Sequence, residues 1–313
     1  MLDNNRSAAV GHIYYYNFSG LNIASEIELI DERQVPAAMF GQAQPDVFIK
    51  NGDVPETIEN PEFTNSILSV SGDMVHIRFS GLARFMINGA GEVTVYQYPG
   101  VTTDRVALCI GSLVQAVLLY KRNYLLMHAA VVKVGDGAVL VVGNSGTGKS
   151  TLALGLQGKG YEILTDDIAS VYFDAGKPMV HAGTSYLRLM ARSLKQYGYK
   201  PEQFREIRSG LNKYSFPLQQ TGVSPLPVNA MYYLYEWNEP KLECIPIQDM
   251  AKFRLIRKGT YKYRLLECLG KKANYFTLST QLASQTPVYK VSRSWSMCPR
   301  EFCDFMDQQF KQI

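Results

Sequence analysis

Hydrophobic and polar residues alternate in short runs over the first third of the chain, which is the pattern of half-buried strands. The clearest run is Met74–Phe79, in which valine, isoleucine and phenylalanine alternate with histidine and arginine. Glycine, serine, asparagine and aspartate separate the runs and favour turns. The pattern predicts a β-rich region with further strands at residues 13–18, 27–30, 47–49, 84–87 and 92–98.

After residue 100 the pattern changes to a helical period. Apolar residues recur three or four positions apart over residues 106–120. We expect this helix to close a β-rich N-terminal domain, residues 1–122. Because 313 residues are many for a single core, a second domain is expected over residues 123–313.

The chain from residue 125 onward predicts a different architecture. Apolar runs at residues 127–134 and 137–142 are typical of buried strands, and the second leads directly into a glycine-rich turn. A helix is predicted over residues 149–156, followed by a short strand at residues 161–164 that ends at an Asp-Asp pair. Strand, turn, helix and strand in this order form the core of an α/β nucleotide-binding unit.

The glycine-rich turn contains G-x-x-x-x-G-K-S, a Walker A phosphate-binding loop, at residues 143–150. Its glycines allow backbone N–H groups to point at phosphate oxygens, and the following helix presents its positive end to the same anion. Lys149 can reach the β- and γ-phosphates, and the Ser150 hydroxyl can ligate magnesium. A chance match is the alternative, but the strand before the loop and the helix after it favour nucleotide binding. We expect the ATP-binding residues to be Gly143, Asn144, Ser145, Gly146, Thr147, Gly148, Lys149, Ser150 and Thr151.

An acidic pair, Asp166 and Asp167, follows the loop by one helix and one strand. Two parallel strands flanking that helix would bring the carboxylates to the same end of the sheet as the loop. One carboxylate can hold magnesium while the other accepts the proton of an attacking hydroxyl. A solvated turn is the alternative, and the nearby loop favours the functional interpretation. His128 lies in an apolar strand, where a lone histidine is usually a core residue.

The histidine, the loop and the acidic pair occur in one arrangement: L-L-M-H-A-A-V-V, then G-N-S-G-T-G-K-S-T-L-A, then G-Y-E-I-L-T-D-D. This arrangement resembles the catalytic domain of the HPr kinase/phosphorylase superfamily over roughly residues 124–190. The resemblance implies an α/β P-loop kinase domain akin to ATP-dependent phosphoenolpyruvate carboxykinase, preceded here by a smaller β-rich domain. The short interval between loop and acidic pair is the specific feature, because the second acidic motif comes much later in ordinary P-loop ATPases.

The resemblance also implies catalytic roles. Asp166, Asp167, His128 and Lys149 would form the catalytic group, with one aspartate as general base and its neighbour on the metal. The sequence leaves open which aspartate has which role, and we expect Ser150 and Asp167 to ligate Mg²⁺.

Two later segments, A-G-T-S-Y-L-R-L-M and N-K-Y-S-F-P-L, resemble those of HPr-kinase-related proteins from peptide natural-product clusters, including lasso-peptide precursor kinases. By that similarity Arg188 and Lys213 are candidate phosphate or substrate contacts, and ordinary surface charge is the alternative. Thr151 stands where HPr kinases tend to carry an acidic residue, which argues against HPr as the substrate.

We therefore expect an ATP- and magnesium-dependent transferase, a serine or threonine kinase acting on a peptide or small protein, for example in lasso peptide biosynthesis. The alternatives are a small-molecule kinase and a non-catalytic nucleotide-binding regulator. A basic tract at residues 251–272 has eight lysines and arginines against one acid, Glu267. It could receive an acidic peptide or nucleotide phosphates, but a solvated face of a helix or strand pair is the favoured interpretation.

The composition gives expectations about the ligand, the cysteines and the cellular location. A net charge of +4 is compatible with an anionic ligand and does not indicate nucleic acid. The five cysteines are scattered without a C-x-x-C pair, so neither a disulfide framework nor a zinc site is indicated. No uninterrupted apolar run approaches the roughly 18 residues that cross a bilayer, and the first residues lack the features of a signal peptide. We expect a cytoplasmic protein with no membrane partner, and a homo-oligomer stays open.

Overall fold

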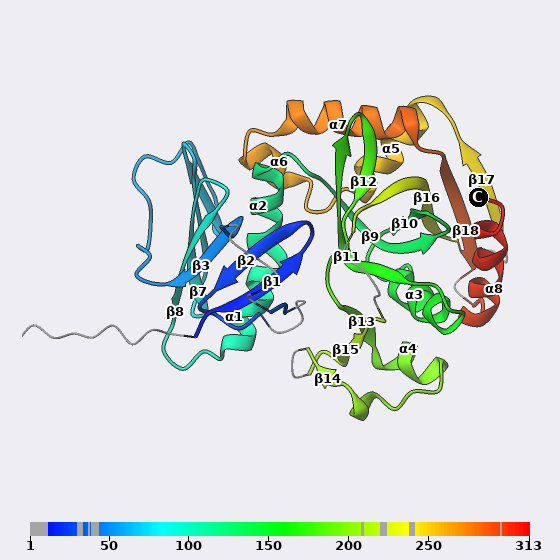
Figure 1. Ribbon diagram of the computed structural model, residues 1–313, viewed down its shortest axis with the longest axis horizontal. Helices are drawn as coiled ribbons and strands as arrows, with labels where there is room; N and C mark the ends of the chain where they lie inside the picture. The colour runs from blue at the N-terminus through cyan, green and yellow to red at the C-terminus, as the bar shows by residue number, and fades with distance from the viewer. Residues whose placement is uncertain are drawn as a thin grey trace, which may run out of the picture. The chain divides into compact units, whose positions relative to one another are not determined.

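The computed structural model describes residues 12–29, 34–36, 38, 44–207, 210–219, 224–237, 242–294 and 296–313 (Figure 1). These residues form two compact units. The second unit contains residues 18–20 and the chain from Gln115 onward, and the first contains the other described residues before Gln115. The sequence pattern suggests a boundary after residue 122, at the end of a helix, whereas the units divide inside that helix.

An eight-stranded sheet forms the first unit, in the order β1-β2-β3-β8-β7-β6-β5-β4. β3 pairs in parallel with β2 and β8, and consecutive strands from β4 to β8 pair antiparallel. In β6, Val75 and Ile77 are fully buried, as their alternation predicts. His76 is also buried, and its Nε2 lies 2.9 Å from the Pro55 carbonyl oxygen. The strands are β1 (Tyr14–Phe18), β2 (Leu21–Ser25), β3 (Val47–Asn51), β4 (Phe63–Thr64), β5 (Leu68–Ser71), β6 (Met74–Phe79), β7 (Ala83–Asn88) and β8 (Glu92–Gln97).

The predicted strand at residues 27–30 is wrong for its described part, residues 27–29, and residue 30 lies outside the described chain. β2 is instead the strand in this region. The Ser25 hydroxyl accepts a hydrogen bond from the Ile27 N–H (3.0 Å) and donates one to the Ile27 carbonyl (2.7 Å). A serine that bonds the backbone two residues ahead competes with strand pairing, so the strand ends there.

A helical stretch runs across the boundary between the units. It comprises α1 (Thr103–Cys109), the π-helical turn η2 (Ile110–Val114) and α2 (Gln115–Lys121). By length and composition alone, this helix could cross a membrane. Gly111, Ser112 and Gln115 interrupt the apolar residues of this helix without adding charge, so the sequence contains no continuous apolar run here. Of its apolar window, 61% is buried inside the structure, as in the core helix of a soluble protein.

The second unit is built on a seven-stranded sheet in the order β10-β9-β11-β12-β16-β18-β17. β10 also pairs with β16, in parallel, so five of these strands close into a ring. The strands are β9 (Leu125–Val134), β10 (Gly137–Gly143), β11 (Ile163–Asp174), β12 (Lys177–Val180), β16 (Leu226–Trp237), β17 (Glu243–Ile247) and β18 (Val288–Ser294).

Helices cover this sheet on two sides. Figure 1 shows α3 (Lys149–Gly158) and α8 (Pro299–Phe310) on one side, and α5 (Asp249–Gly259) and α7 (Lys272–Gln285) on the other. Leu152 and Leu156 of α3 lie in one buried cluster with Val139 and Val141 of β10 and with Phe302 of α8. This packing fixes the start of α3 relative to the end of β10. The remaining elements are α4 (Ala191–Gln196), η3 (Pro201–Gln203), α6 (Arg264–Cys268) and a small sheet of β13 (Tyr186–Met190), β14 (Arg205–Glu206) and β15 (Lys213–Pro217).

β11 differs from its prediction. The expected strand at residues 161–164 ends before the acidic pair, whereas β11 extends through it from Ile163 to Asp174. Thr165–Val171 pair with β9, so backbone hydrogen bonding to a neighbouring strand overrides the local turn tendency of Asp-Asp. The acidic pair is consequently part of a paired strand.

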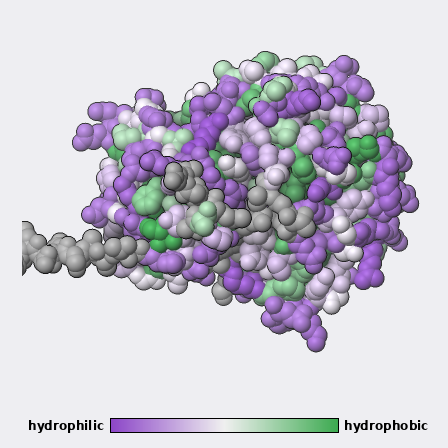
Figure 2. Space-filling view, in the orientation of Figure 1, coloured by the Kyte–Doolittle hydropathy of each residue, from purple (hydrophilic) through white to green (hydrophobic). Residues whose placement is uncertain are grey.

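Most hydrophobic side chains lie inside the structure. Figure 2 shows a face covered mainly by hydrophilic residues, with hydrophobic ones in small groups. Among large hydrophobic residues, Met250 (65%) and Phe276 (58%) are the most exposed of those described. Buried hydrophobic residues are found in both units of the chain.

Candidate active site

The loop between β10 and α3 adopts the tight turn that its glycines allow. Gly146 and Gly148 have φ values of +92° and +87°, in the left-handed region that favours glycine. Gly143 is needed for a different reason, since a Cβ there would lie 2.8 Å from Thr147 Oγ1. The loop leads into the N-terminus of α3, the end of a helix that attracts anions.

Two cationic side chains hold the loop backbone. Lys149 is only 5% exposed, and its Nζ donates to the carbonyls of Gly143 (2.8 Å) and Asn144 (3.0 Å). From β18, Arg293 Nη2 donates to the carbonyl of Thr147 at 2.9 Å. Both cations are thus fixed beside the loop, where their charge favours a phosphate.

The register of the sheet brings the acidic pair to the loop. β9 lies between β10 and β11 and is antiparallel to both, so β10 and β11 run parallel. Asp166 of β11 and Val141 of β10 both pair with Ala130. The pair therefore lies level with the last residues of β10. The expected parallel strands are present, but β9 separates them.

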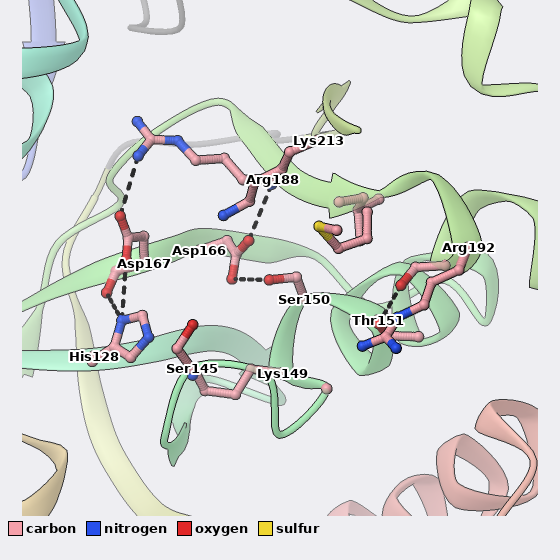
Figure 3. A pocket seen from close by; sticks show the side chains of 15 residues that line it. His128, Ser145, Lys149, Ser150, Thr151, Asp166, Asp167, Arg188, Arg192 and Lys213 are labelled. Carbon is pink, nitrogen blue, oxygen red and sulfur yellow. Dashed lines mark hydrogen bonds and ion pairs between the residues drawn. The ribbon is translucent and has the colours of Figure 1, made fainter. Parts of the chain in front are cut away.

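Both carboxylates line the same cavity, although successive side chains of a regular strand point to opposite faces. Asp167 has a φ of +104°, an unusual conformation for a residue with a side chain. Figure 3 shows Asp166 directed toward Ser150, and Asp167 directed toward His128 and the Arg188 guanidinium. Backbone strain like that at Asp167 persists where the surrounding structure enforces it, often at functional sites.

Asp166 is almost fully buried, with 2% of its surface exposed. One carboxylate oxygen accepts a hydrogen bond from the Ser150 hydroxyl (3.1 Å), and the other accepts one from the Arg188 backbone N–H (3.2 Å). Burial, together with the charge of Asp167, raises the pKa of Asp166 above its ordinary value despite these bonds. A cation beside this carboxylate would favour its charged form.

Asp167 has the opposite environment. Its carboxylate lies 3.0 Å from His128 Nδ1 and accepts a bond from Arg188 Nη1 at 3.2 Å. Burial acts to raise the pKa of Asp167, but the bond from His128 and the charges of Arg188, His128 and Lys213 outweigh it and lower the pKa. His128 Nδ1 also lies 3.1 Å from the Asp167 carbonyl oxygen. Since both of these oxygens are acceptors, Nδ1 carries a proton.

The cavity has a volume of about 270 Å³ and an excess of positive charge. Four cationic side chains line it, Lys149, Arg188, Arg192 and Lys213, against the two carboxylates. A concave site with this balance favours an anionic ligand.

The structure brings the predicted site residues together. The cavity is lined by Ser145, Gly146, Gly148, Lys149, Ser150, Thr151, His128, Asp166, Asp167, Arg188 and Lys213. Gly143 and Asn144 line a neighbouring cavity. Thr147 faces neither, because its buried hydroxyl donates to the Asn144 carbonyl at 2.9 Å.

No protein-family model matches the chain, and no curated protein matches it. Among solved structures, the chain is similar to the HPr(Ser) kinase/phosphatase from Coxiella burnetii, with a TM-score of 0.32 and 12% sequence identity. The match covers 60% of this chain and 97% of that chain. A similarity this weak shows neither the family nor the activity, so the function is inferred from the geometry of the site.

The site residues fit magnesium in their chemistry. A serine hydroxyl and a carboxylate are oxygen ligands of the kind that Mg²⁺ prefers, and Ser150 and Asp166 lie within hydrogen-bond distance. In the described part of the chain, no group of three or more His, Cys, Asp or Glu side chains is placed to hold a metal. Magnesium here would therefore take most of its ligands from phosphate and water, which is its usual mode with nucleotides.

Some lining residues were not predicted from sequence. Arg192 and Ser193 follow Arg188 closely, and the spacing L-R-L-M-A-R could have indicated that both arginines lie near one site. The Ser193 hydroxyl lies 2.8 Å from that of Thr151. Arg293 is far from the loop in sequence, and no local pattern connects the two.

Proposed function

We propose that this protein is an ATP- and magnesium-dependent kinase that transfers the γ-phosphate to a serine or threonine hydroxyl of a peptide or small protein. One observation carries the proposal: two adjacent carboxylates line the cavity at the phosphate loop and have different bonding partners. Asp166 is bonded to Ser150, and Asp167 is bonded to His128 and Arg188. A phosphate-binding site that only recognises nucleotide does not need this second, charged arrangement.

The phosphate-binding part comprises the loop N–H groups, the N-terminus of α3 and Lys149. The loop backbone would hold the β-phosphate, and Lys149 would contact the β- and γ-phosphates. Arg188, Arg192 and Lys213 add positive charge on the opposite wall of the cavity. Because phosphoryl transfer depends mainly on positioning and on charge stabilisation, this set addresses most of the chemistry.

Ser150 and Asp166 are the proposed magnesium ligands. When bound there, the metal would supply positive charge that offsets the negative charge of the phosphates during transfer. From the sequence, the expected magnesium ligands are Ser150 and Asp167. The contacts favour Asp166 instead of Asp167, because Asp166 is the carboxylate that Ser150 touches. Its burial gives a further reason, since a cation would offset the unfavourable environment of the charge.

Asp167 is the proposed base. The acceptor oxygen forms a bond to the γ-phosphorus while the bond from that phosphorus to the β,γ-bridging oxygen breaks, and ADP leaves. Asp167 accepts the proton of the hydroxyl. Its lowered pKa makes it a weak base that is always ionised at neutral pH, which suits a loose transition state where the proton moves late. His128 and Arg188 would fix the orientation of the carboxylate.

The experiment is mass spectrometry of candidate peptides after incubation with the protein, ATP and magnesium. The candidates include the leader and core of any precursor peptide encoded nearby. Asp166→Asn and Asp167→Asn are the variants to compare, because both keep the size of the side chain. We expect a gain of one phosphate that Asp167→Asn reduces by about 10²-fold or more, the scale of a lost general base, and that Asp166→Asn also reduces because it removes a proposed magnesium ligand.

Other outcomes would select the alternatives. Phosphorylation of small hydroxyl compounds but of no peptide would indicate a small-molecule kinase. Tight ATP binding with no phosphoryl transfer, unchanged in both variants, would indicate a nucleotide-binding regulator and overturn the proposal.

A further inference from the structure

A second cavity adjoins the first at the phosphate loop. It has a volume of about 260 Å³ and is lined by the start of the loop, by the end of α5 and by the segment that follows α5. His128 and Ser145 line both cavities and therefore lie where the two meet. The remaining lining residues are Gly143, Asn144, Lys258, Thr260, Tyr261 and Lys262.

Close backbone packing places the segment 258–262 beside the loop. A Cβ at Gly259 would lie 2.2 Å from Val142 Cγ1, so only glycine permits this approach to β10. Thr260 forms a β-bridge with Met127, and the Tyr261 N–H donates to the Leu126 carbonyl at 2.9 Å. The segment is thus held along β9 immediately before His128. Its backbone is therefore held in place beside the cavity.

The chemistry of this segment favours negative charge. Lys258 and Lys262 are exposed, and within the described chain no carboxylate forms an ion pair with either. Tyr261 lies between them in sequence, with its ring 6.0 Å from the His128 ring and 5.2 Å from Lys262 Nζ. Burial and the nearby charge of Asp167 raise the pKa of Tyr261, so it is a neutral hydrogen-bond donor. None of the lining side chains is acidic.

The direction of the loop assigns the two cavities different tasks. Thr151, in the first turn of α3, lines the first cavity, whereas Gly143 and Asn144, at the end of β10, line the second. In phosphoryl transfer, the attacking and leaving oxygens lie on opposite sides of phosphorus, roughly in line. Donor and acceptor must therefore approach from different sides. His128, with Asp167 bonded to it, stands at the junction.

We propose that the second cavity receives the phosphate acceptor, and that Lys258 and Lys262 select an acceptor with negative charge beside its hydroxyl. This inference rests on the proposed kinase function and specifies its substrate class. The charge can come from aspartate or glutamate in a peptide, or from a phosphate or carboxylate on a small molecule. A solvated face of a helix or strand pair, the interpretation that the sequence favours for residues 251–272, does not explain why these lysines line a cavity beside His128.

The test measures binding of anionic probes to the protein loaded with magnesium and a non-hydrolysable ATP analogue. One probe is an aspartate-rich peptide with a single serine, compared with the same peptide built on asparagine. The other is glycerol 3-phosphate, compared with glycerol. Lys258→Gln, Lys262→Gln and the double variant are titrated by calorimetry. Arg254→Gln is the matched control, because Arg254 is exposed on the same helix and does not line the cavity.

We expect the protein to bind one anionic probe and to bind its neutral counterpart more weakly. Each lysine change should raise the Kd of the anionic probe about two- to fivefold, as for exposed ion pairs, with a larger effect in the double variant. The control should be unchanged, and so should the Kd of the nucleotide in every variant. Which of the two probes binds distinguishes a peptide acceptor from a small phosphorylated one.

Equal binding of anionic and neutral probes, binding of neither, or affinities unaffected by the lysine changes would overturn the inference. A loss of nucleotide affinity in the lysine variants would also overturn it, because the second cavity would then hold the nucleotide. Failure of the proposed function has a different signature. It would appear as absence of ATP binding or of aspartate-dependent phosphoryl transfer in the unaltered protein.

Discussion

Asp166 and Asp167 are neighbours in the chain, yet their surroundings shift their pKa values in opposite directions. Burial dominates for Asp166, whereas the bond from His128 and the charge of Arg188 prevail over burial for Asp167. When the environment separates the pKa values of two neighbouring carboxyl groups, the two can take different roles in catalysis. This difference can be measured as stability, because a pKa shift on folding is a change in folding free energy.

We expect Asp166→Asn to stabilise the nucleotide- and metal-free protein at pH 7. With a raised pKa, Asp166 costs stability as the pH rises from the ordinary carboxyl value, near 4, through the raised one. Asparagine removes this cost, because its NH₂ group can donate to the Ser150 oxygen and its carbonyl oxygen can still accept from the Arg188 N–H. The Tm should rise by about 2–4 °C, the effect of roughly 1 kcal/mol in a unit of this size. Thermal unfolding with excess chelator is the measurement.

Asp167→Asn serves as the comparison and should act in the opposite sense. The stabilisation from ionised Asp167 is present above the ordinary carboxyl pKa and is lost as the pH falls through its lowered pKa. At pH 7 the variant should lose about 1–3 kcal/mol, the cost of breaking charged hydrogen bonds. Near pH 3 its deficit should be smaller. Shifts of the same sign in both variants at pH 7 would contradict the described environments.

At the scale of elements, secondary structure was predictable from sequence where a strong local pattern marks the helix or strand. Met74–Phe79 and the start of α3 at Lys149 were predicted, because period-two alternation and the glycine-rich turn are local signals. The position of β9 between β10 and β11 was not predicted, because strand order depends on pairing between distant segments. The site residues near the loop were predicted for the same local reasons, and Arg293 on β18 was not.

Gly148 illustrates how one position joins the loop to a distant strand. A Cβ there would meet Arg293 Nη2 at 2.6 Å, and the φ of +87° disfavours any other residue. Gly148→Ala should destabilise the protein by about 1–2 kcal/mol, the cost of a left-handed residue with a side chain. It should also weaken nucleotide binding, because Arg293 has to move from the Thr147 carbonyl. Urea denaturation and nucleotide titration would measure the two effects.

Gly158→Ala is the matched control. Gly158 ends the same helix, and a Cβ there meets nothing within 4 Å. Alanine should leave nucleotide binding unchanged and raise stability by about 0.5–1 kcal/mol, the usual gain from replacing a helical glycine. If both variants weakened nucleotide binding equally, the effect would not come from the loop conformation.

At the scale of the whole molecule, the two units differ in their relation to the site. Every residue that lines the two cavities lies after Gln115, in the second unit. A ligand that binds only the folded form stabilises the part that binds it, by about 2.7 kcal/mol at a concentration of 100 times its Kd. The first unit has a separate sheet and core.

We therefore expect calorimetry to show two unfolding transitions, of which a magnesium–ATP analogue shifts one. At 100 times the Kd, the transition of the second unit should rise by roughly 5–10 °C. The transition of the first unit should stay in place. A single transition that moves as a whole would show that the units unfold together, and no shift in either would contradict nucleotide binding.

The closed ring of strands in the second unit limits the strand edges through which the protein could self-associate. Because β10 pairs with both β9 and β16, the strand that carries the phosphate loop has no open edge. Among the described strands of this sheet, β17 alone has a neighbour on one side only. Open strand edges invite pairing with another chain, and proline blunts them because it has no N–H to donate. Pro246 is the fourth residue of that five-residue edge strand and follows the exposed Ile245, so the edge lacks a backbone donor next to an exposed hydrophobic side chain.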